Sequence, residues 1–311
     1  TIDLGAGDNI AAGGVGSDSI TTLGGSDIVL GDNGLVDYDN AMGSLILVQS
    51  TDTDPANILG GDDTIAAGDG DNVVIGGNGI DTVTAGTGND YALGDNGLIR
   101  YENMGGGIFR LTEVRTSDTD ITTGAGETID LGAGDNIAAG GVGSDLITTL
   151  GGSDIVLGDN GIIDYDNATG SLVLVQSTDT DPANILGGDD TIAVGDGDNH
   201  VIGGNGIDTV TAGTGNDHVL GDNGLIRYEN MGGIFRLTEA RTADTDASTG
   251  GDDRLDAGDG DNIVLGGIGA DDITTLGGSD IVLGDNGIID YDNATGSLVL
   301  VQSTDTDPAN I

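Results

Sequence analysis

The chain has 311 residues, of which 54 are acidic and only seven are basic, all of them arginine, so that its formal net charge is -47. This acidity argues against nucleic acids and anionic membrane surfaces as partners, because both attract basic proteins. Cysteine is absent, which excludes disulfides and thiol chemistry.

The 61 glycines and an aromatic content of 3% leave two possibilities. One is a disordered acidic chain, and the other is a fold that a divalent cation completes. Regular glycine–aspartate turns between short runs of Val, Ile and Leu favour the second. No apolar run approaches the roughly 20 residues of a membrane span, and no signal peptide opens the chain, so we expect neither.

The sequence repeats with a period of 127 residues, since TIDLGAGDNI at 1–10 returns at 128–137. Each period contains two related modules, which we name A and B, and the chain reads A-B-A-B-A. The expected modules, of which the first is shortened at its N-terminus, are 1–57, 58–123, 124–184, 185–249 and 250–311.

Each module begins with short glycine-led repeats, such as GDGDNVVI at 68–75, which lead to a GDNG turn. We expect each short repeat to form one very short strand with a single side chain in the core. The second half has two β-rich runs around an Asn/Gly turn, such as 98–102 and 108–120. These runs predict a hairpin or one oversized turn. No window has the apolar period of a helix.

Two expectations concern the hairpins. If their strands join the sheets of the short repeats, the 127-residue unit rises roughly 30 Å along its axis. In SLVLVQ at 171–176, Leu172 and Leu174 should point one way, and Val173 and Val175 the other. Both faces are apolar, so we expect both to be covered, one of them by a second layer.

Five segments fit the nine-residue pattern G-G-x-G-x-D-x-U-x, in which U is a large apolar residue: 13–21, 76–84, 140–148, 203–211 and 266–274. The glycines suit a tight turn, the aspartate supplies a carboxylate there, and x-U-x suits a very short strand. The pattern closely resembles the RTX, or hemolysin-type, calcium-binding repeats. The resemblance implies an all-β, calcium-bound parallel β-roll or β-solenoid, here with inserted hairpins and stacked into a rod.

The resemblance also implies which residues hold calcium, namely backbone carbonyls of the glycine turns and aspartates of stacked turns. In the intact motifs the aspartates are Asp18, Asp81, Asp145, Asp208 and Asp271, and in the following repeats they are Asp27, Asp90, Asp154, Asp217 and Asp280. The shorter repeats supply Asp8, Asp63, Asp71, Asp135, Asp190, Asp198, Asp253 and Asp261, and the GDNG turns supply Asp32, Asp95, Asp159, Asp222 and Asp285. The alternative is that Asp and Gly only favour turns. Glu127 replaces aspartate and makes its own repeat a doubtful site.

A second group of carboxylates follows each hairpin as a D-T-D pair. Alternate residues of a strand share a face, so both carboxylates of a pair could meet one cation. They could equally form a solvated edge that blocks sheet addition. The pairs are Asp52/Asp54, Asp118/Asp120, Asp179/Asp181, Asp244/Asp246 and Asp305/Asp307.

The sequence offers no catalytic constellation. His200 and His218 are the only histidines, and the first B module has Val73 and Tyr91 in their places. No nucleophile–base pair is found, so we expect no enzyme. Six of the seven arginines lie in the B hairpins near glutamates. They predict cross-strand ion pairs, with a contact between neighbouring molecules as the alternative.

Two functions fit these patterns. The first is a structural segment of a long extracellular bacterial adhesin, matrix or surface filament, with further copies of the same repeat as partners. The second is a calcium-triggered folding and secretion module of a toxin or hydrolase. The resemblance implies type I secretion in either case. The uninterrupted tandem of modules favours the filament.

Overall fold

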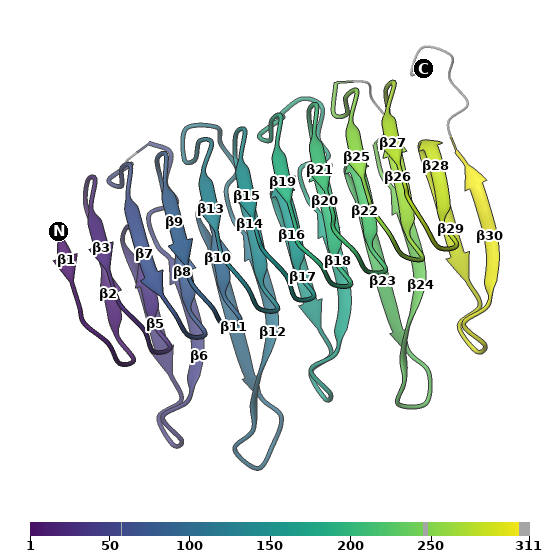
Figure 1. The fold of residues 1–311 in the computed structure, drawn as a ribbon. Helices are drawn as coiled ribbons and strands as arrows, with labels where there is room; N and C mark the ends of the chain where they lie inside the picture. The colour runs from purple at the N-terminus through teal and green to yellow at the C-terminus, as the bar shows by residue number, and fades with distance from the viewer. Residues whose placement is uncertain (57, 245–247, 305–311) are drawn as a thin grey trace.

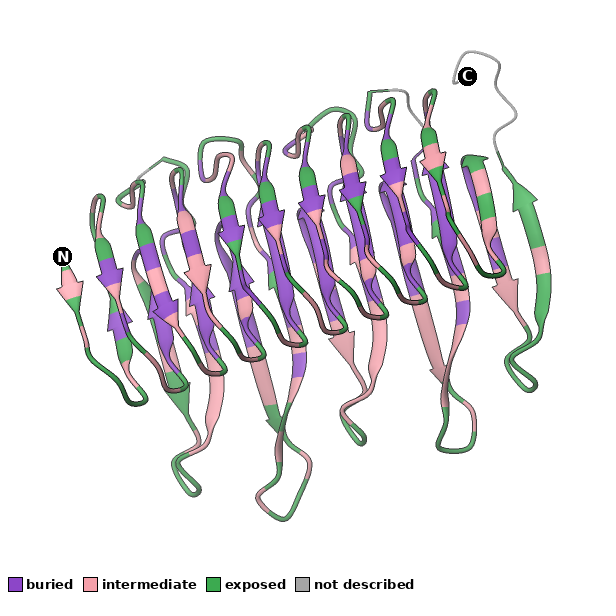
Figure 2. Cartoon of the chain, in the orientation of Figure 1, coloured by how far each residue is buried: buried purple, intermediate pink, exposed green. Residues whose placement is uncertain are grey.

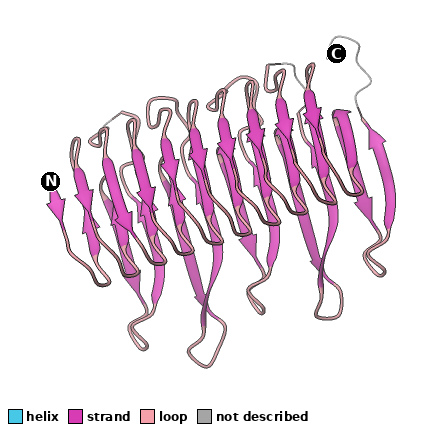
Figure 3. Ribbon diagram, viewed as in Figure 1, coloured by secondary structure: helices cyan, strands magenta, loops and turns pink. Residues whose placement is uncertain are grey.

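The computed structural model describes residues 1–56, 58–244 and 248–304. None of these residues lies in a helix, and the regular elements are all strands (Figure 3). No helix in these ranges is therefore long and apolar enough to cross a membrane. The strands stack along one axis from the N-terminus to the C-terminus (Figure 1), and the predicted all-β parallel roll is confirmed.

Two parallel sheets form the roll, and the chain alternates between them as the short repeats predict. The first sheet contains β1 (Ile2–Asp3), β3 (Ser19–Thr21), β7 (Thr64–Gly68), β9 (Thr82–Ala85), β13 (Thr128–Asp130), β15 (Leu146–Thr148), β19 (Thr191–Ala193), β21 (Thr209–Thr211), β25 (Arg254–Asp256) and β27 (Asp272–Thr274). The second contains β2 (Ile10–Ala12), β4 (Ile28–Leu30), β8 (Val73–Ile75), β10 (Tyr91–Leu93), β14 (Ile137–Gly141), β16 (Ile155–Asp159), β20 (His200–Gly204), β22 (His218–Asp222), β26 (Ile263–Gly267) and β28 (Ile281–Asp285).

The hairpins form a third, antiparallel sheet. It contains β5 (Gly34–Tyr38), β6 (Leu45–Ser50), β11 (Gly97–Asn103), β12 (Phe109–Thr116), β17 (Gly161–Tyr165), β18 (Leu172–Ser177), β23 (Gly224–Asn230), β24 (Phe235–Thr242), β29 (Gly287–Tyr291) and β30 (Leu298–Ser303). Consecutive hairpins pair with each other, for example β6 with β11. The predicted hairpins are confirmed. Their strands do not join the sheets of the roll, so the condition for a rise of roughly 30 Å is not met.

This arrangement corrects the axial rise. Residues 58–184 add β7, β9, β13 and β15 to the first sheet, and the hairpins add nothing to it. With strands spaced 4.7–4.9 Å apart, the 127-residue unit rises about 19 Å rather than 30 Å.

A thin core fills the roll between its two sheets. Each strand contributes mainly one inward side chain, such as Ile20, Val29, Ile65 and Val74, and these are at most 1% exposed. Parallel pairing places equal positions above each other, as Ile20 beside Ile65. The core is therefore a stack of similar apolar layers that each new module extends.

A second core lies between the second and third sheets. In β4 the central Val29 faces the roll, whereas Ile28 and Leu30 belong to the cluster that contains Val48 of β6. All three residues of this strand are buried, which differs from the single buried side chain that the short repeats predict. The third sheet covers the outer face of the second, and Figure 2 shows this buried interior.

The A hairpin contains a β-bulge that the sequence analysis missed. Tyr165 pairs with Leu172 and Asp164 with Leu174, so Val173 has no partner across the ladder. Leu172 packs with fully buried Val175 against the second sheet. The prediction that Val173 and Val175 share a face is therefore wrong, because one extra residue reverses the alternation.

Candidate metal centre

The segments that lead into the strands of the first sheet, from the second sheet or from a hairpin, bring nine carboxylates into one row, which we name the carboxylate edge. It lies along the top of Figure 1. Each residue immediately precedes a strand of the first sheet, and parallel pairing stacks equal positions. The members are Asp18, Asp63, Asp81, Glu127, Asp145, Asp190, Asp208, Asp253 and Asp271.

Hydrogen bonds join the rungs of the carboxylate edge. Asp18 donates its backbone N–H to Oδ1 of Asp63 at 2.6 Å, and Asp63 donates to Oδ1 of Asp81 at 2.7 Å. The other carboxylate oxygen of seven rungs is buried and has no hydrogen-bond partner, namely Oδ2 of Asp63, Asp81, Asp145, Asp190, Asp208, Asp253 and Asp271. A buried carboxylate oxygen without a partner is costly, which indicates a ligand at this edge.

Glycines leave the space in which these free oxygens meet backbone carbonyls. A Cβ on Gly31 would lie 2.2 Å from Oδ2 of Asp63 and 2.4 Å from the carbonyl oxygen of Gly76. On Gly158 it would lie 2.0 Å from Oδ2 of Asp190 and 2.4 Å from the carbonyl oxygen of Gly203. Carboxylate and carbonyl oxygens are the ligands that calcium prefers, so the residues fit this ion. The same cradle is found at Gly13, Gly76, Gly140, Gly203, Gly221 and Gly266.

The electrostatics of the edge require a counter-charge. Burial, with the nearby charges of Asp63 and Asp32, raises the pKa of Asp81 to about 8. Burial likewise raises the pKa of Asp253 to about 8 and that of Asp63 to about 6. Without a cation, Asp81 and Asp253 with a pKa of about 8 hold their protons at neutral pH, whereas Asp63 with a pKa of about 6 holds its proton only in mildly acidic solution. A bound divalent cation would reverse this, because its charge favours the carboxylate form.

Glu127 stands where the other repeats have aspartate, and it still occupies a rung of the carboxylate edge. Both of its carboxylate oxygens are buried without a partner. Burial and the neighbouring Asp95 and Asp145 raise its pKa far above the ordinary value. The longer side chain stays within the carboxylate row but interrupts its pattern. It accepts no backbone N–H from Asp81, and a Cβ on Gly94 would meet Cγ and Cβ of Glu127 and not a carboxylate oxygen.

The opposite turns, which lead from the first sheet to the second, form a row that we name the mixed edge. Asp27 donates its backbone N–H to Oδ1 of Asn72, and Asn72 donates its own to Oδ1 of Asp90. Aspartate and asparagine alternate in this way along the whole row. The aspartates are the predicted Asp27, Asp90, Asp154, Asp217 and Asp280, and the asparagines are Asn9, Asn72, Asn136, Asn199 and Asn262.

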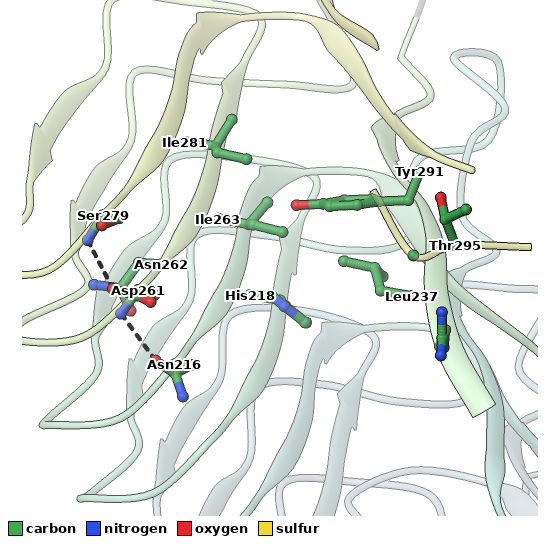
Figure 4. A pocket seen from close by; sticks show the side chains of 12 residues that line it. Asn216, His218, Leu237, Asp261, Asn262, Ile263, Ser279, Ile281, Tyr291 and Thr295 are labelled. Carbon is green, nitrogen blue, oxygen red and sulfur yellow. Dashed lines mark hydrogen bonds between the residues drawn. The ribbon is translucent and has the colours of Figure 1, made fainter. Parts of the chain in front are cut away.

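Sequence reasoning missed these asparagines because it searched for carboxylates. It selected instead the aspartates one residue earlier: Asp8, Asp71, Asp135, Asp198 and Asp261. These are exposed and lie outside the row. Asp261, for example, accepts the backbone N–H of Ser279 at 2.8 Å and donates its own N–H to Asn216 (Figure 4). Counting two residues back from the core position U would have found the asparagines.

The GDNG aspartates lie where the chain leaves the roll for a hairpin. Asp32, Asp95, Asp159 and Asp222 are at most 2% exposed, whereas Asp285 in the last layer is exposed. Asp159 accepts the backbone N–H groups of Gly188 and Asn205. The GDNG aspartates thus accept hydrogen bonds from backbone N–H groups at the point where a hairpin is inserted into the roll.

The D-T-D pairs separate rather than converge on one ion. Asp52 is buried, and its Oδ2 accepts the backbone N–H groups of Leu59 and Gly60 at 2.8 and 2.9 Å. Asp54 is exposed and closes a local turn with the N–H of Ala56. Asp118 and Asp179 are likewise buried, while Asp120 is partly exposed and Asp181 is exposed. Asp244 is buried, and Asp246, Asp305 and Asp307 lie outside the described residues.

The two histidines lie between the second and third sheets. His200 Nε2 is 2.6 Å from the Tyr228 hydroxyl, and His218 Nδ1 is 3.1 Å from it. Burial lowers the pKa of His218 to about 4. His218 also lines a shallow pocket beside Tyr291 (Figure 4). Within the described ranges, no group of three or more His, Cys, Asp or Glu side chains is arranged to hold a metal.

The arginines of the B hairpins pair within the third sheet. Arg100 lies opposite Glu113 across β11 and β12, and their charged atoms are 2.9 Å apart. Arg227 and Glu239 repeat this pair at 2.9 Å in the second B module. The predicted cross-strand ion pairs are therefore confirmed.

Comparison with known proteins identifies the repeat. The RTX calcium-binding nonapeptide repeat (4 copies) matches residues 3–34, 59–92, 75–97, 130–162, 186–219 and 248–282. The hairpin strands β12, β18 and β24 lie outside these matches. No curated protein matches the chain. The matched segments cover more than half of the chain and contain every residue of both edges except Glu127, and the chain therefore belongs to the RTX calcium-binding repeat family.

Proposed function

We propose that this calcium-binding repeat protein is a structural segment of a secreted bacterial adhesin, matrix or surface filament. The observation that carries the proposal is that each module adds the same set of strands, two to each of the three sheets. Residues 58–123 add β7 and β9 to the first sheet, β8 and β10 to the second, and β11 and β12 to the third. Residues 124–184 repeat this with β13 to β18. Such a fold lengthens by repetition, which suits a spacer or filament.

A role without catalysis agrees with the described side chains. His200 and His218 are packed against Tyr228, and burial holds the pKa of both imidazoles below the ordinary value. Neither histidine has an equivalent in the first B module, where Val73 and Tyr91 take their positions. A segment whose copies differ at these positions does not depend on a histidine base.

Further copies of the repeat are the proposed partners, because they would continue the sheets. Val301 of the last hairpin is 42% exposed, whereas its counterpart Val175 is fully buried. Ile10 in the second strand of the roll is 55% exposed, and its counterpart Ile137 is 4% exposed. One more layer at either end would bury these side chains.

The family typically occurs in secreted bacterial proteins, and we place this chain outside the cell for the same reason. Calcium is abundant there, and ions at the carboxylate edge would offset the repulsion of its aspartates. On this proposal calcium both completes the fold and stiffens the segment.

The test compares the chain with calcium and after thorough calcium removal, by circular dichroism and small-angle scattering. We expect an elongated β-structure with calcium and loss of β-structure without it. A compact globule in calcium would refute the structural role. An unchanged β-spectrum without calcium would refute its dependence on the ion. Mg²⁺ should substitute poorly, because it requires a tight octahedron of ligands.

A further inference from the structure

The two edges of the roll differ in the side chain that occupies every second layer. All nine rungs of the carboxylate edge are carboxylates, whereas the mixed edge has asparagine in alternate layers. Four of these asparagines, Asn72, Asn136, Asn199 and Asn262, have no exposed surface. They therefore belong to the interior of the turn, where an ion would bind, and not to its solvated surface.

The amide nitrogen of each asparagine lies among oxygens of the type that calcium binds. Nδ2 of Asn72 donates to the carbonyl oxygens of Gly68 and Gly70, at 3.2 and 2.8 Å, and lies 2.8 Å from Oδ1 of Asp90. In Asn199 the same nitrogen contacts the carbonyl oxygens of Gly195 and Gly197 at 3.1 and 3.0 Å. The corresponding contacts recur in Asn9, Asn136 and Asn262.

A neutral amide can replace an ion at such a place. Its two N–H groups satisfy carbonyl oxygens that would otherwise need a cation, and it adds no charge. An ion and the amide nitrogen cannot occupy the same position. The asparagine turns are consequently complete without metal.

The aspartate layers of the same edge remain open. Oδ2 of Asp27, Asp90 and Asp217 is buried and has no hydrogen-bond partner. Asp154 differs in that its Oδ2 accepts the Thr149 hydroxyl at 2.7 Å. Along this edge, amide-filled layers thus alternate with aspartate layers, three of which have a free buried carboxylate oxygen.

We propose that the mixed edge binds calcium in its aspartate layers only, and that the asparagine amide takes the place of the ion in the others. The carboxylate edge, which has no asparagine, binds calcium in its successive aspartate layers. The inference rests on calcium binding by the repeat and is independent of the proposed structural role. It assigns Asn9, Asn72, Asn136, Asn199 and Asn262 as the residues that determine which layers take metal.

The direct test is a crystal structure of the whole chain grown with Tb³⁺ in place of calcium, with the ions located by anomalous scattering. We expect peaks in successive layers of the carboxylate edge and in alternate layers of the mixed edge, with none beside an asparagine Nδ2. Peaks in every layer of the mixed edge would overturn the proposal. Peaks at neither edge would overturn calcium binding by the roll altogether, which is a distinguishable result.

A pair of variants tests the assignment in solution. Asn72→Asp with Asn199→Asp replaces two amides by carboxylates, and equilibrium dialysis should find two additional calcium ions per chain. The matched control is Asn89→Asp with Asn216→Asp, which adds the same charge at exposed positions of the neighbouring turns. We expect no additional ion in the control. A first variant that folds with the wild-type ion count, or that stays unfolded in saturating calcium, contradicts the proposal.

Discussion

At the scale of single residues, the carboxylate edge depends on aspartates that have one hydrogen-bonded oxygen and one free oxygen. Asp81 accepts a backbone N–H through Oδ1, and its Oδ2 is buried without a partner. Asp71, ten residues earlier, is exposed and lies outside both rows. The two positions therefore differ in that Asp81 has a free buried oxygen, whereas Asp71 is exposed to water.

The first prediction uses this contrast. Asp81→Asn with Asp208→Asn should raise the calcium concentration at half-saturation at least about tenfold, because charged ligands are lost. Asp71→Asn with Asp198→Asn should change it less than about twofold. Calcium titrations followed by circular dichroism measure both. Equal shifts in the two variants would mean that net charge, and not the position in the edge, controls binding.

The second prediction concerns pH. Burial raises the folded-state pKa of Asp81 and Asp253 from 3.8 to about 8, so the folded metal-free chain binds more protons than the unfolded chain. Its stability is then greatest below about pH 4 and is lost as the pH rises toward 8. In calcium-free buffer, circular dichroism should therefore show less β-structure at pH 8 than at pH 5. Calcium affinity should change in the opposite sense, since binding releases protons. A metal-free chain that is more stable at pH 8 contradicts the assignment.

The third prediction concerns the glycine cradle. Gly158 and Gly284 occupy equivalent positions, but a Cβ on Gly158 meets Asp190 and Gly203, whereas one on Gly284 meets nothing within 4 Å. Gly158→Ala should lower the free energy of unfolding in calcium by about 1–3 kcal/mol. Gly284→Ala should change it by less than about 0.5 kcal/mol. Thermal or chemical denaturation of the two variants in the same buffer gives the comparison.

At the scale of the elements, the third sheet converts the second sheet from a half-exposed surface into an interior layer. The strands of the two sheets are equal in number in every module, so each hairpin strand has a roll strand to cover. Val48, Ile99, Val114 and Val175 are at most 1% exposed in this contact. The fully buried apolar surface of the hairpins is therefore an integral part of the fold.

The fourth prediction tests the bulge in β18. Val175→Thr places a hydroxyl in the apolar contact and should cost about 1–3 kcal/mol of stability. Val173→Thr, at the partly exposed bulge, should cost less than about 0.5 kcal/mol. Both variants retain a β-branched side chain, so strand propensity is matched. Similar losses in both would mean that Val173 also packs inward.

The sequence was informative about the elements to the extent that each depends on local chemistry. The x-U-x strands, the glycine turns and the hairpins follow from residue pattern, and the structure contains them. Placement of the hairpins did not follow, because nothing local distinguishes a strand that extends a roll sheet from one that covers it. The bulge at Val173 was missed for a related reason, since its register is set by pairing with β17.

For the candidate site, the motif aspartates such as Asp145 were found directly because the nine-residue pattern names them. Asn136 was not, since an amide is absent from that pattern although it occupies the same rung position as Asp154. Asp135 was selected in its place because it is the nearest carboxylate. Positions in the two rows can be read from spacing relative to the core residue more reliably than from residue type alone.

At the scale of the whole molecule, the length is proportional to the number of modules. The fifth prediction is that residues 185–311, which add β19, β21, β25 and β27 to the first sheet, lengthen the particle by about 19 Å. Small-angle scattering of 1–184 and 1–311 in calcium should show this increase with an unchanged cross-section. An increase near 30 Å would mean that the hairpins also contribute layers to the roll.

The register between hairpins has a consequence for how such a protein changes over generations. Val48 of β6 lies beside Ile99 of β11, and Val175 of β18 lies beside Ile226 of β23, so the joints between successive A and B modules are the same. Residues 1–56 and 128–183, one unit apart, are also nearly identical in sequence. Unequal recombination between them would remove or insert one A–B pair and leave every remaining joint intact. Each such event would change the length of the protein by about 19 Å, and no compensating mutation would be needed to restore the fold.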